Sequence, residues 1–262
     1  MEATDGNSLP IVLPVKDMPD DPENDTLAKS LPKFPSCLCI YASYRSGKSN
    51  LLANYFLNSN FYRNRFDRIF LYSPTATNDP TMRYFFDDDK NPPEPVDGVE
   101  VIDDPNDWEN HLSALIQHQK EMKNSPDEEK IAVAFDDCVG NLGKMTSLMN
   151  VIPTKFRHAN IRLLIYVSQS YKMLSRTIRT NCKGMIIMKL SNFGELEKIK
   201  EEVDGFMDGH FEELYDYCIT DQPFSFMFID MASNPVSVYL RHEKLIWAGT
   251  IDYRNKQSEE SE

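Results

Sequence analysis

The sequence predicts an α/β fold with a mostly parallel central sheet, flanked by helices and bordered by an antiparallel edge. Short apolar runs alternate with segments of helical periodicity between residues 37 and 203, which is typical of parallel strands joined by crossover helices. Two later apolar runs, 224–229 and 236–240, are joined through an Asn-Pro pair. They predict an antiparallel pair of strands at the sheet edge.

Length and composition favour one domain. The chain has 262 residues, of which 41% are hydrophobic, enough for a substantial core. Its formal net charge of −13 argues against a protein that coats nucleic acid by bulk electrostatics, because phosphate contacts require Lys and Arg. A local basic surface stays open. The five cysteines are predicted to be buried thiols in a reducing compartment, with a metal at Cys37 and Cys39 as the alternative.

The two ends of the chain differ from its centre. We expect residues 1–30 to form a flexible arm rich in acids and prolines, 31–250 a single domain, and 251–262 a polar tail. The apolar stretch 11–14 packs either on a neighbouring molecule or on its own subunit. The N-terminus has no signal-peptide pattern, and no apolar run reaches membrane-spanning length. We therefore expect a soluble, intracellular protein.

A phosphate-binding loop is predicted directly after the first apolar run, 37–41. The P-loop pattern is Gly, four residues and Gly-Lys-Ser/Thr. In it, backbone amides and a helix N-terminus cradle phosphate, Lys reaches the terminal phosphates, and the hydroxyl holds Mg²⁺. Here Ala42 replaces the first Gly, which is tolerable if that position does not need a positive φ. A Gly-Lys-Ser surface turn is the alternative. The predicted nucleotide-binding residues are Ala42, Ser43, Tyr44, Arg45, Ser46, Gly47, Lys48 and Ser49.

The residues after this loop predict a right-handed βαβ unit. Positions 48–57 carry apolar residues on one side of a helix, and the apolar run 68–73 predicts the next strand. The acidic, proline-rich segment 87–95 is predicted to be an exposed loop, with cation binding by its Asp run as the alternative. Further strands are predicted at 99–102, 131–137, 161–170 and 185–190, and further helices at 106–122, 195–203 and 211–218.

The apolar run 131–135 ends in two carboxylates, Asp136 and Asp137, as a Walker B strand does. In such a strand one acid holds hydrated Mg²⁺, and its neighbour orients and polarises the attacking water. We assign Asp136, together with Ser49, to the metal and Asp137 to the water. A buried strand that runs into an Asp-rich turn is the alternative. The upstream Lys48 and Ser49 favour the nucleotide site.

Gln169 follows another apolar run, 161–167, at a position where the strand ends of such sheets face the nucleotide. We interpret Gln169 as a γ-phosphate sensor or a water-positioning group. A glutamine that caps a loop is the alternative. Lys48, Asp137 and Gln169 are thus the predicted catalytic residues within one subunit.

A segment without acidic residues extends from 138 to 194. It is predicted to present cations at one edge of the nucleotide site. Two roles fit: an arginine finger delivered across a subunit interface, and contacts with DNA phosphates that do not depend on sequence. Solvated helix faces account for some of these residues. Arg157 and Arg179, in short polar connections, are the finger candidates. The cations are Lys144, Lys155, Arg157, Arg162, Lys172, Arg176, Arg179, Lys183 and Lys189.

With these residues assembled, the sequence resembles the genome-packaging ATPases of large DNA viruses and virophages, a branch of the FtsK–HerA superfamily of P-loop ATPases. The resemblance covers roughly residues 37–190. It rests on four segments: 42–49, Phe135-Asp136-Asp137, 156–161, and 167–170 followed by 178–181. Family members usually have Gly at the position of Ala42.

The resemblance implies a RecA/FtsK-like fold and ATP hydrolysis with Mg²⁺ as cofactor. It further implies a homo-oligomeric ring with sites between subunits that moves double-stranded DNA into a preformed capsid. The partners would then be double-stranded DNA, further copies of the chain and capsid proteins, in the virion or the host cytoplasm. Two other functions stay open from the residues themselves. One is a nucleotide-dependent switch or scaffold that orders a complex, and the weaker one is a small-molecule kinase.

Overall fold

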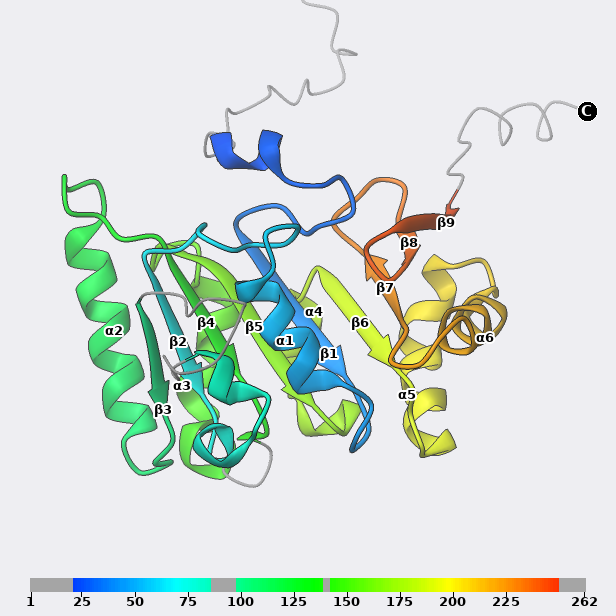
Figure 1. The fold of residues 1–262 in the computed structure, drawn as a ribbon, viewed down its shortest axis with the longest axis horizontal. Helices are drawn as coiled ribbons and strands as arrows, with labels where there is room; N and C mark the ends of the chain where they lie inside the picture. The colour runs from blue at the N-terminus through cyan, green and yellow to red at the C-terminus, as the bar shows by residue number, and fades with distance from the viewer. Residues whose placement is uncertain (1–20, 86–97, 139–141, 250–262) are drawn as a thin grey trace, which may run out of the picture.

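The computed structural model describes residues 21–85, 98–138 and 142–249. A nine-stranded sheet runs through them in the order β3-β2-β4-β5-β1-β6-β7-β8-β9. The six strands from β3 to β6 are parallel, and β7, β8 and β9 extend the sheet as antiparallel strands (Figure 1). The predicted α/β fold, mostly parallel with an antiparallel edge, is confirmed.

The strands follow the apolar runs closely. Six parallel strands are β1 (Ser36–Tyr41), β2 (Arg68–Tyr72), β3 (Val99–Ile102), β4 (Ile131–Phe135), β5 (Ile161–Ser168) and β6 (Gly184–Met188). The antiparallel edge consists of β7 (Phe226–Asp230), β8 (Ser237–Leu240) and β9 (Lys244–Ala248). Strands β1, β4, β5 and β6 are buried along their whole length, because helices or loops cover both faces of the sheet there.

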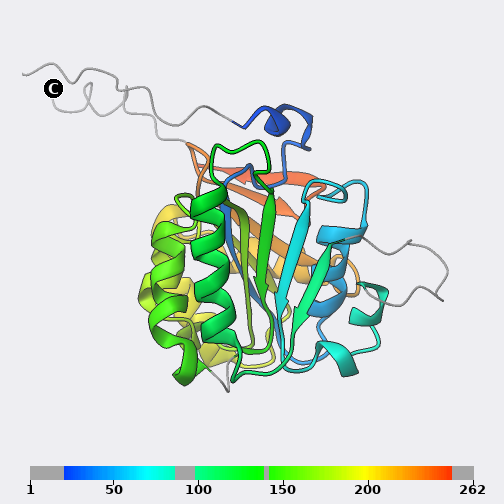
Figure 2. The ribbon, with the colours of Figure 1, turned by 90° about the vertical axis from the view of Figure 1, so that its left-hand side faces the viewer.

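Helices lie unevenly on the two faces of the sheet. One face carries α2 (Trp108–Met122), α3 (Leu142–Lys155), α4 (Arg176–Asn181), α5 (Phe193–Val203) and α6 (Phe211–Thr220). The other face is covered by α1 (Lys48–Leu57), the N-terminal segment and the connection after β2, as the turned view in Figure 2 shows. Alternate residues of β1 separate accordingly into two apolar cores, since Cys37, Cys39 and Tyr41 face the larger helix layer and Leu38 and Ile40 face α1.

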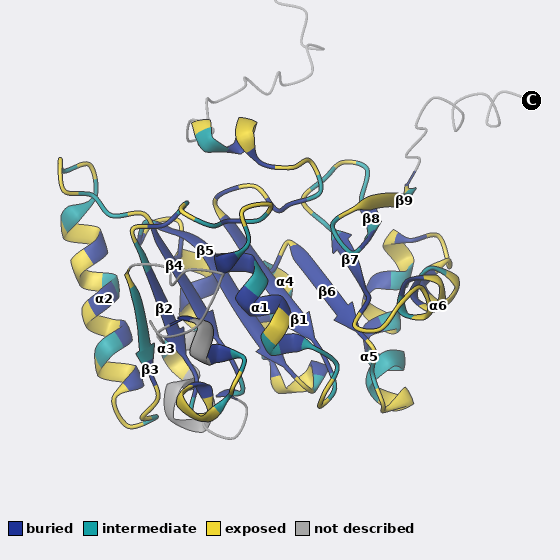
Figure 3. Ribbon diagram, viewed as in Figure 1, coloured by how far each residue is buried: buried dark blue, intermediate teal, exposed yellow. Residues whose placement is uncertain are grey.

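Three elements were not anticipated. The helix α3 contains Pro153, and α4 has only six residues, so that neither has a clear helical pattern in the sequence. Strand β9 lies at the open edge of the sheet with its residues exposed or partly buried, and no strand was expected over its short apolar run, 245–248 (Figure 3). No helix among the described residues is both long and apolar enough to cross a membrane.

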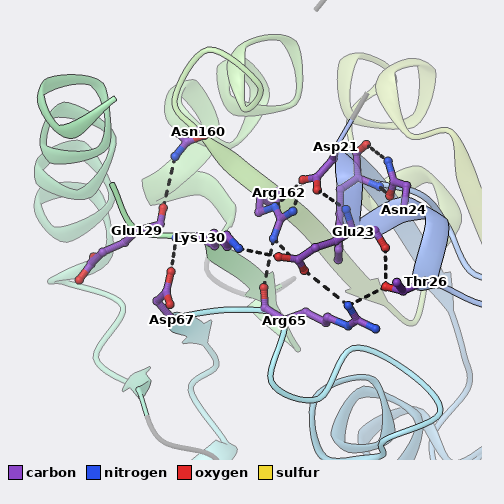
Figure 4. A network of polar contacts seen from close by, with 11 residues as sticks. Asp21, Glu23, Asn24, Thr26, Arg65, Asp67, Glu129, Lys130, Asn160 and Arg162 are labelled. Carbon is purple, nitrogen blue, oxygen red and sulfur yellow. Dashed lines mark hydrogen bonds and ion pairs between the residues drawn. The ribbon is translucent and has the colours of Figure 1, made fainter. Parts of the chain in front are cut away.

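The end of the predicted arm packs on the domain. The short helical turn Pro22–Thr26 lies against the amino ends of β4 and β5, where the Arg162 side chain is 9% exposed. The Arg162 guanidinium forms ion pairs with Asp21 and Glu23, and Lys130 lies 2.5 Å from Glu23 (Figure 4). We call these four residues the arm clamp. Residues 11–14 lie outside the described residues, and the arm boundary stays a prediction.

Candidate nucleotide site

The predicted phosphate loop connects the carboxyl end of β1 to the first residue of α1. Gly47 precedes the helix with φ 95°, and Arg45 also has a positive φ, of 60°. Two left-handed residues so close together turn the chain sharply over the helix N-terminus, where backbone N–H groups bind anions. The loop is also fixed from outside, because the Ser43 hydroxyl accepts a 2.7 Å hydrogen bond from the Ser191 N–H.

Ala42 occupies its position without strain. It is completely buried, its N–H donates to the Ser168 carbonyl at 3.1 Å, and it is not among the residues with positive φ. The loop thus needs left-handed backbone at 45 and 47 and not at 42. An alanine at the first position is compatible with the turn for this reason.

The two carboxylates after β4 have different surroundings. Asp136 is 2% exposed and its N–H donates to the Tyr72 carbonyl at 2.9 Å, so that the backbone continues the β2–β4 pairing. Asp137 turns away with φ 50°, and its side chain remains 26% exposed. The change of direction places one carboxylate inside the sheet edge and the other over the phosphate loop.

The Lys48 ammonium lies between both acids. Its Nζ contacts Asp137 Oδ1 and is 3.8 Å from Asp136 Oδ1. Gln169, the first residue after β5, donates from Nε2 to the same Asp137 oxygen at 3.1 Å. The structure thus brings together Lys48, Asp136, Asp137 and Gln169, from the carboxyl ends of three neighbouring strands, as open parallel sheets do at their binding sites.

Burial controls the charge of Asp136. Desolvation raises its pKa to about 6, and the nearby Asp137 and Asp79 carboxylates act in the same direction, whereas the Lys48 ammonium opposes them. Its Oδ1 atom is buried and accepts no hydrogen bond. A buried carboxylate oxygen with no donor fits a cation ligand.

A cleft of about 750 Å³ opens over the loop and is large enough for a nucleotide. Its walls come from the phosphate loop, the start of α1, the connection after β2, Asp137 and the β6–β7 side of the sheet. The lining residues are Tyr44, Arg45, Gly47, Lys48, Ser49, Asn50, Thr75, Asn78, Asp79, Thr81, Asp137 and Phe224. Ser49 is in this wall, so a hydroxyl and the Asp136 carboxylate are available for Mg²⁺.

Sequence reasoning missed part of this cleft. Part of the cleft wall follows β2 and consists of Thr75, Asn78 and Asp79. Polar residues shortly after a strand of a parallel sheet are a signal of a binding site. Phe224 had been assigned to the start of a strand, whereas it lies in the turn before β7 with φ 63°. No pattern in the sequence predicts that an aromatic residue adopts left-handed backbone.

The two finger candidates lie apart from Lys48, Asp137 and Gln169. Arg179 is held within its own chain: its Nε is 3.4 Å from Glu202, its Nη1 donates to the Leu174 carbonyl at 2.7 Å, and its guanidinium stacks on the Tyr171 ring. Arg157 is exposed just before β5. It therefore lies at the amino ends of the parallel strands, opposite to the phosphate loop.

The cation-rich segment 138–194 does not form one edge, and this expectation was wrong. Lys172 and Lys189 follow the carboxyl ends of β5 and β6, whereas Lys155, Arg157 and Lys183 precede the amino ends of these strands. Since β5 and β6 both run parallel to β1, these exposed cations are divided between opposite edges of the sheet.

The nine-stranded sheet and the loop between β1 and α1 give the chain the fold of P-loop ATPases. Neither a protein-family model nor a curated protein sequence matches the chain. Among solved structures, the DNA-packaging ATPase B204 of Sulfolobus turreted icosahedral virus has a TM-score of 0.55 and 16% identity, covering 78% of this chain and 97% of that chain.

Two further structures have the same fold. The genome packaging NTPase B204 of Sulfolobus turreted icosahedral virus 2, in complex with AMPPCP, has a TM-score of 0.54 at 15% identity over 81% of this chain and 98% of that chain. The pCW3 conjugation coupling protein TcpA, with ATPγS, has a TM-score of 0.50 at 11% identity over 87% of this chain and 65% of that chain. At these identities the likeness is one of fold.

Proposed function

We propose that this chain is a Mg²⁺-dependent ATPase that works in a ring of identical subunits and moves double-stranded DNA into a viral capsid. The observation that carries the ATPase part is the convergence of Lys48 and Gln169 on the Asp137 carboxylate, which lines the cleft. The DNA-packaging part is supported by the shared fold with the B204 proteins, a DNA-packaging ATPase and a genome packaging NTPase.

Phosphate binding is the role of the loop. The N–H groups around Gly47 and the Lys48 ammonium would neutralise the β- and γ-phosphates. Lys48 is 8% exposed, and a cation in a partly desolvated site acts more strongly on a phosphate than one in water. The Asp137 oxygen that contacts Lys48 would then be the nearest carboxylate to the terminal phosphate.

Ser49 and Asp136 would hold the metal. A Mg²⁺ ion bound there would supply positive charge that offsets the negative charge of the phosphates. The buried Oδ1 of Asp136, which accepts no hydrogen bond, would supply one ligand. Burial raises the pKa of Asp136, and a cation bound beside it would lower that pKa and favour the ionised carboxylate.

Hydrolysis requires a positioned water. One oxygen of Asp137 accepts a hydrogen bond from the Gln169 amide. The Asp137 side chain is also partly exposed to the cleft. In this arrangement Asp137 would accept a hydrogen bond and a proton from water, and Gln169 would hold that carboxylate in line with the γ-phosphate. An arginine from the next subunit, Arg157 or Arg179, would add positive charge from the open side.

The proposed partners are double-stranded DNA, other copies of the chain and capsid proteins, in the virion or in the host cytoplasm. Lys172 and Lys189, at the edge of the sheet that carries the phosphate loop, are candidates for contacts with the DNA backbone. Such contacts would not depend on base sequence.

The test is the steady-state ATPase rate and the oligomeric mass of the full chain, each with and without double-stranded DNA. We expect a rate that rises with DNA and disappears in Lys48→Ala, together with a multimeric mass. A DNA-independent rate would contradict translocation and leave an NTPase. Very slow turnover with nucleotide-dependent binding of a protein partner would instead identify a switch or scaffold. Transfer of phosphate to a metabolite would identify a kinase.

A further inference from the structure

The turn before β7 contains an aromatic residue where a glycine is normally required. Ser225 N–H donates to the Gln222 carbonyl at 3.2 Å, which closes a four-residue turn around Pro223 and Phe224. Pro fixes a negative φ at the second position, and Phe224 has φ 63° at the third. Turns of this type favour Gly or Asn at the third position, and a bulky residue there is strained.

The Phe224 ring lies against the phosphate loop and is not buried by it. Its side chain is 67% exposed. A Cβ atom placed on Gly47 would lie 3.0 Å from Phe224 Cδ1, so that the ring directly covers this glycine. Strained backbone together with an exposed aromatic ring beside a binding loop indicates a functional requirement, because packing alone would not maintain either.

The Phe224 ring and the Asp137–Gln169 pair lie on opposite sides of β1. Asp137 and Gln169 follow β4 and β5, on one side of β1. Phe224 precedes β7, on the other side of β1, beyond β6. A nucleotide whose terminal phosphate faces Asp137 has room to extend its ribose and base toward β6 and β7. Two exposed aromatic residues, Tyr44 and Phe224, line the cleft, and Phe224 is the one that precedes β7.

Space for a base is present on both sides of this ring. Phe224 lines the cleft over the phosphate loop and also a second cavity of about 480 Å³. The second cavity is formed by the loop residues 43–46, by Lys189 and Ser191 after β6, and by residues 219–225. The Phe224 ring thus stands between them.

We propose that Phe224 is the base-stacking residue of the nucleotide site, an inference that rests on the nucleotide-binding function proposed above. Stacking uses the π-face that every base has, and it is stronger for the larger purine ring systems. The site would therefore bind purine nucleotides more tightly than pyrimidine nucleotides, and it would bind tripolyphosphate without any contribution from Phe224.

The test compares ATP, CTP and tripolyphosphate binding to the full chain with Mg²⁺, by calorimetry. We expect Phe224→Ala to weaken ATP binding by about tenfold or more and to leave tripolyphosphate binding unchanged. Phe224→Gly removes the ring and relieves the left-handed backbone. Phe224→Gly should raise the melting temperature and weaken ATP binding as much as Phe224→Ala does. The matched control is Phe206→Ala, which removes another exposed ring far from the phosphate loop.

Phe224→Trp provides a second measurement. It should retain ATP affinity, and its fluorescence should respond to ATP and not to tripolyphosphate. The inference is overturned if Phe224→Ala weakens both ligands equally, because the ring would then only shape the loop at Gly47. It is also overturned if neither affinity changes, or if only the oligomeric mass changes. A wild-type chain that binds neither ligand, or a Lys48→Ala chain that binds both normally, would refute the nucleotide site itself.

Discussion

Gln169 donates a 3.1 Å hydrogen bond from Nε2 to Asp137 Oδ1. The two residues are 32 positions apart and follow neighbouring strands, β5 and β4. The same Asp137 oxygen contacts the Lys48 ammonium. The orientation of one carboxylate is thus fixed from two directions, by Gln169 after the adjoining strand β5 and by Lys48 at the start of α1.

Replacing Gln169 by Ala should slow hydrolysis without preventing nucleotide binding. The substitution leaves the Asp137–Lys48 contact in place and removes only the amide that orients the carboxylate. We expect kcat to fall roughly 100-fold, as for the loss of one positioned donor. ATP affinity should change by no more than about twofold. Gln117→Ala, an exposed glutamine of α2, is the matched control. Equal losses of kcat and affinity would assign Gln169 to phosphate binding.

Asp136 and Asp137 should separate metal binding from hydrolysis. Asp137→Asn should bind Mg²⁺-ATP and lose activity by about 10²–10⁴-fold, because the amide cannot accept a proton. Asp136→Asn should lose the difference in ATP affinity between Mg²⁺ and EDTA buffers. It should also raise the melting temperature, since burial disfavours the charged Asp136 side chain. An Asp136→Asn chain with normal Mg²⁺-dependent affinity would remove Asp136 from the metal site.

The positions of the loop after β1 and of the two acids after β4 were predictable because their signals are local. An apolar run, a Gly-Lys-Ser sequence and a helical pattern lie within 37–57, and the structure places the helix at Lys48–Leu57 as expected. The Asp136 and Asp137 roles stay predictions, although both side chains do lie beside Lys48.

Features that depend on distant contacts were not predictable. Arg162 belonged to a segment interpreted as a basic surface, yet Asp21, 141 positions away, neutralises it at the amino edge of the sheet. The apolar run 224–229 predicts a strand that includes Phe224. Phe224 becomes part of the cleft only because its turn lies over Gly47 in the folded chain. Propensity has no information on such contacts.

Arg157 and Arg179 should differ in what their loss does to stability. Arg179→Ala removes an ion pair with Glu202, a backbone hydrogen bond and a stacked ring, and should lower the free energy of unfolding by about 2 kcal/mol. Arg157→Ala should change it by less than about 0.5 kcal/mol, because the side chain is exposed. Urea titrations measure both.

Mixing experiments then test the finger role. If Arg157 acts across a subunit interface, Arg157→Ala alone should bind ATP without hydrolysing it. Mixed rings with Lys48→Ala should regain part of the activity, because some interfaces combine an intact loop with an intact arginine. If activity returns when Arg179→Ala is mixed with Lys48→Ala, and does not return when Arg157→Ala is mixed with it, Arg179 is the arginine finger.

The arm clamp should stabilise the fold through Arg162. Arg162→Met leaves the Asp21 and Glu23 carboxylates beside each other without their partly buried cation. It should lower the free energy of unfolding by about 2–3 kcal/mol. It should also expose residues 21–30 to proteases. Lys130→Ala, which removes the half-exposed cation of the same clamp, should cost no more than about 1 kcal/mol. Equal effects of both substitutions would show that burial of Arg162 is unimportant.

His242 should make the fold sensitive to mild acid. Its Nε2 is 2.7 Å from the Tyr55 hydroxyl and its Nδ1 is 2.8 Å from the Ser30 carbonyl, while aromatic rings such as Phe228 surround it. Burial lowers the pKa of His242 to about 4, whereas an unfolded histidine has a pKa of about 6.5. The unfolded chain therefore binds the proton more tightly between these values, and stability falls as the pH falls through this window.

The size of the effect can be isolated by comparison with a side chain that does not titrate. Between pH 7 and pH 4, the lowered pKa of His242 should reduce the free energy of unfolding of the wild type by about 3 kcal/mol. Asp136, whose pKa is raised to about 6, acts in the opposite direction because the folded state binds its proton more tightly. Since His242→Gln retains Asp136, the difference between the two unfolding curves reports His242 alone. A difference that is constant from pH 7 to pH 4 would show that His242 has the same pKa in the folded and unfolded chains.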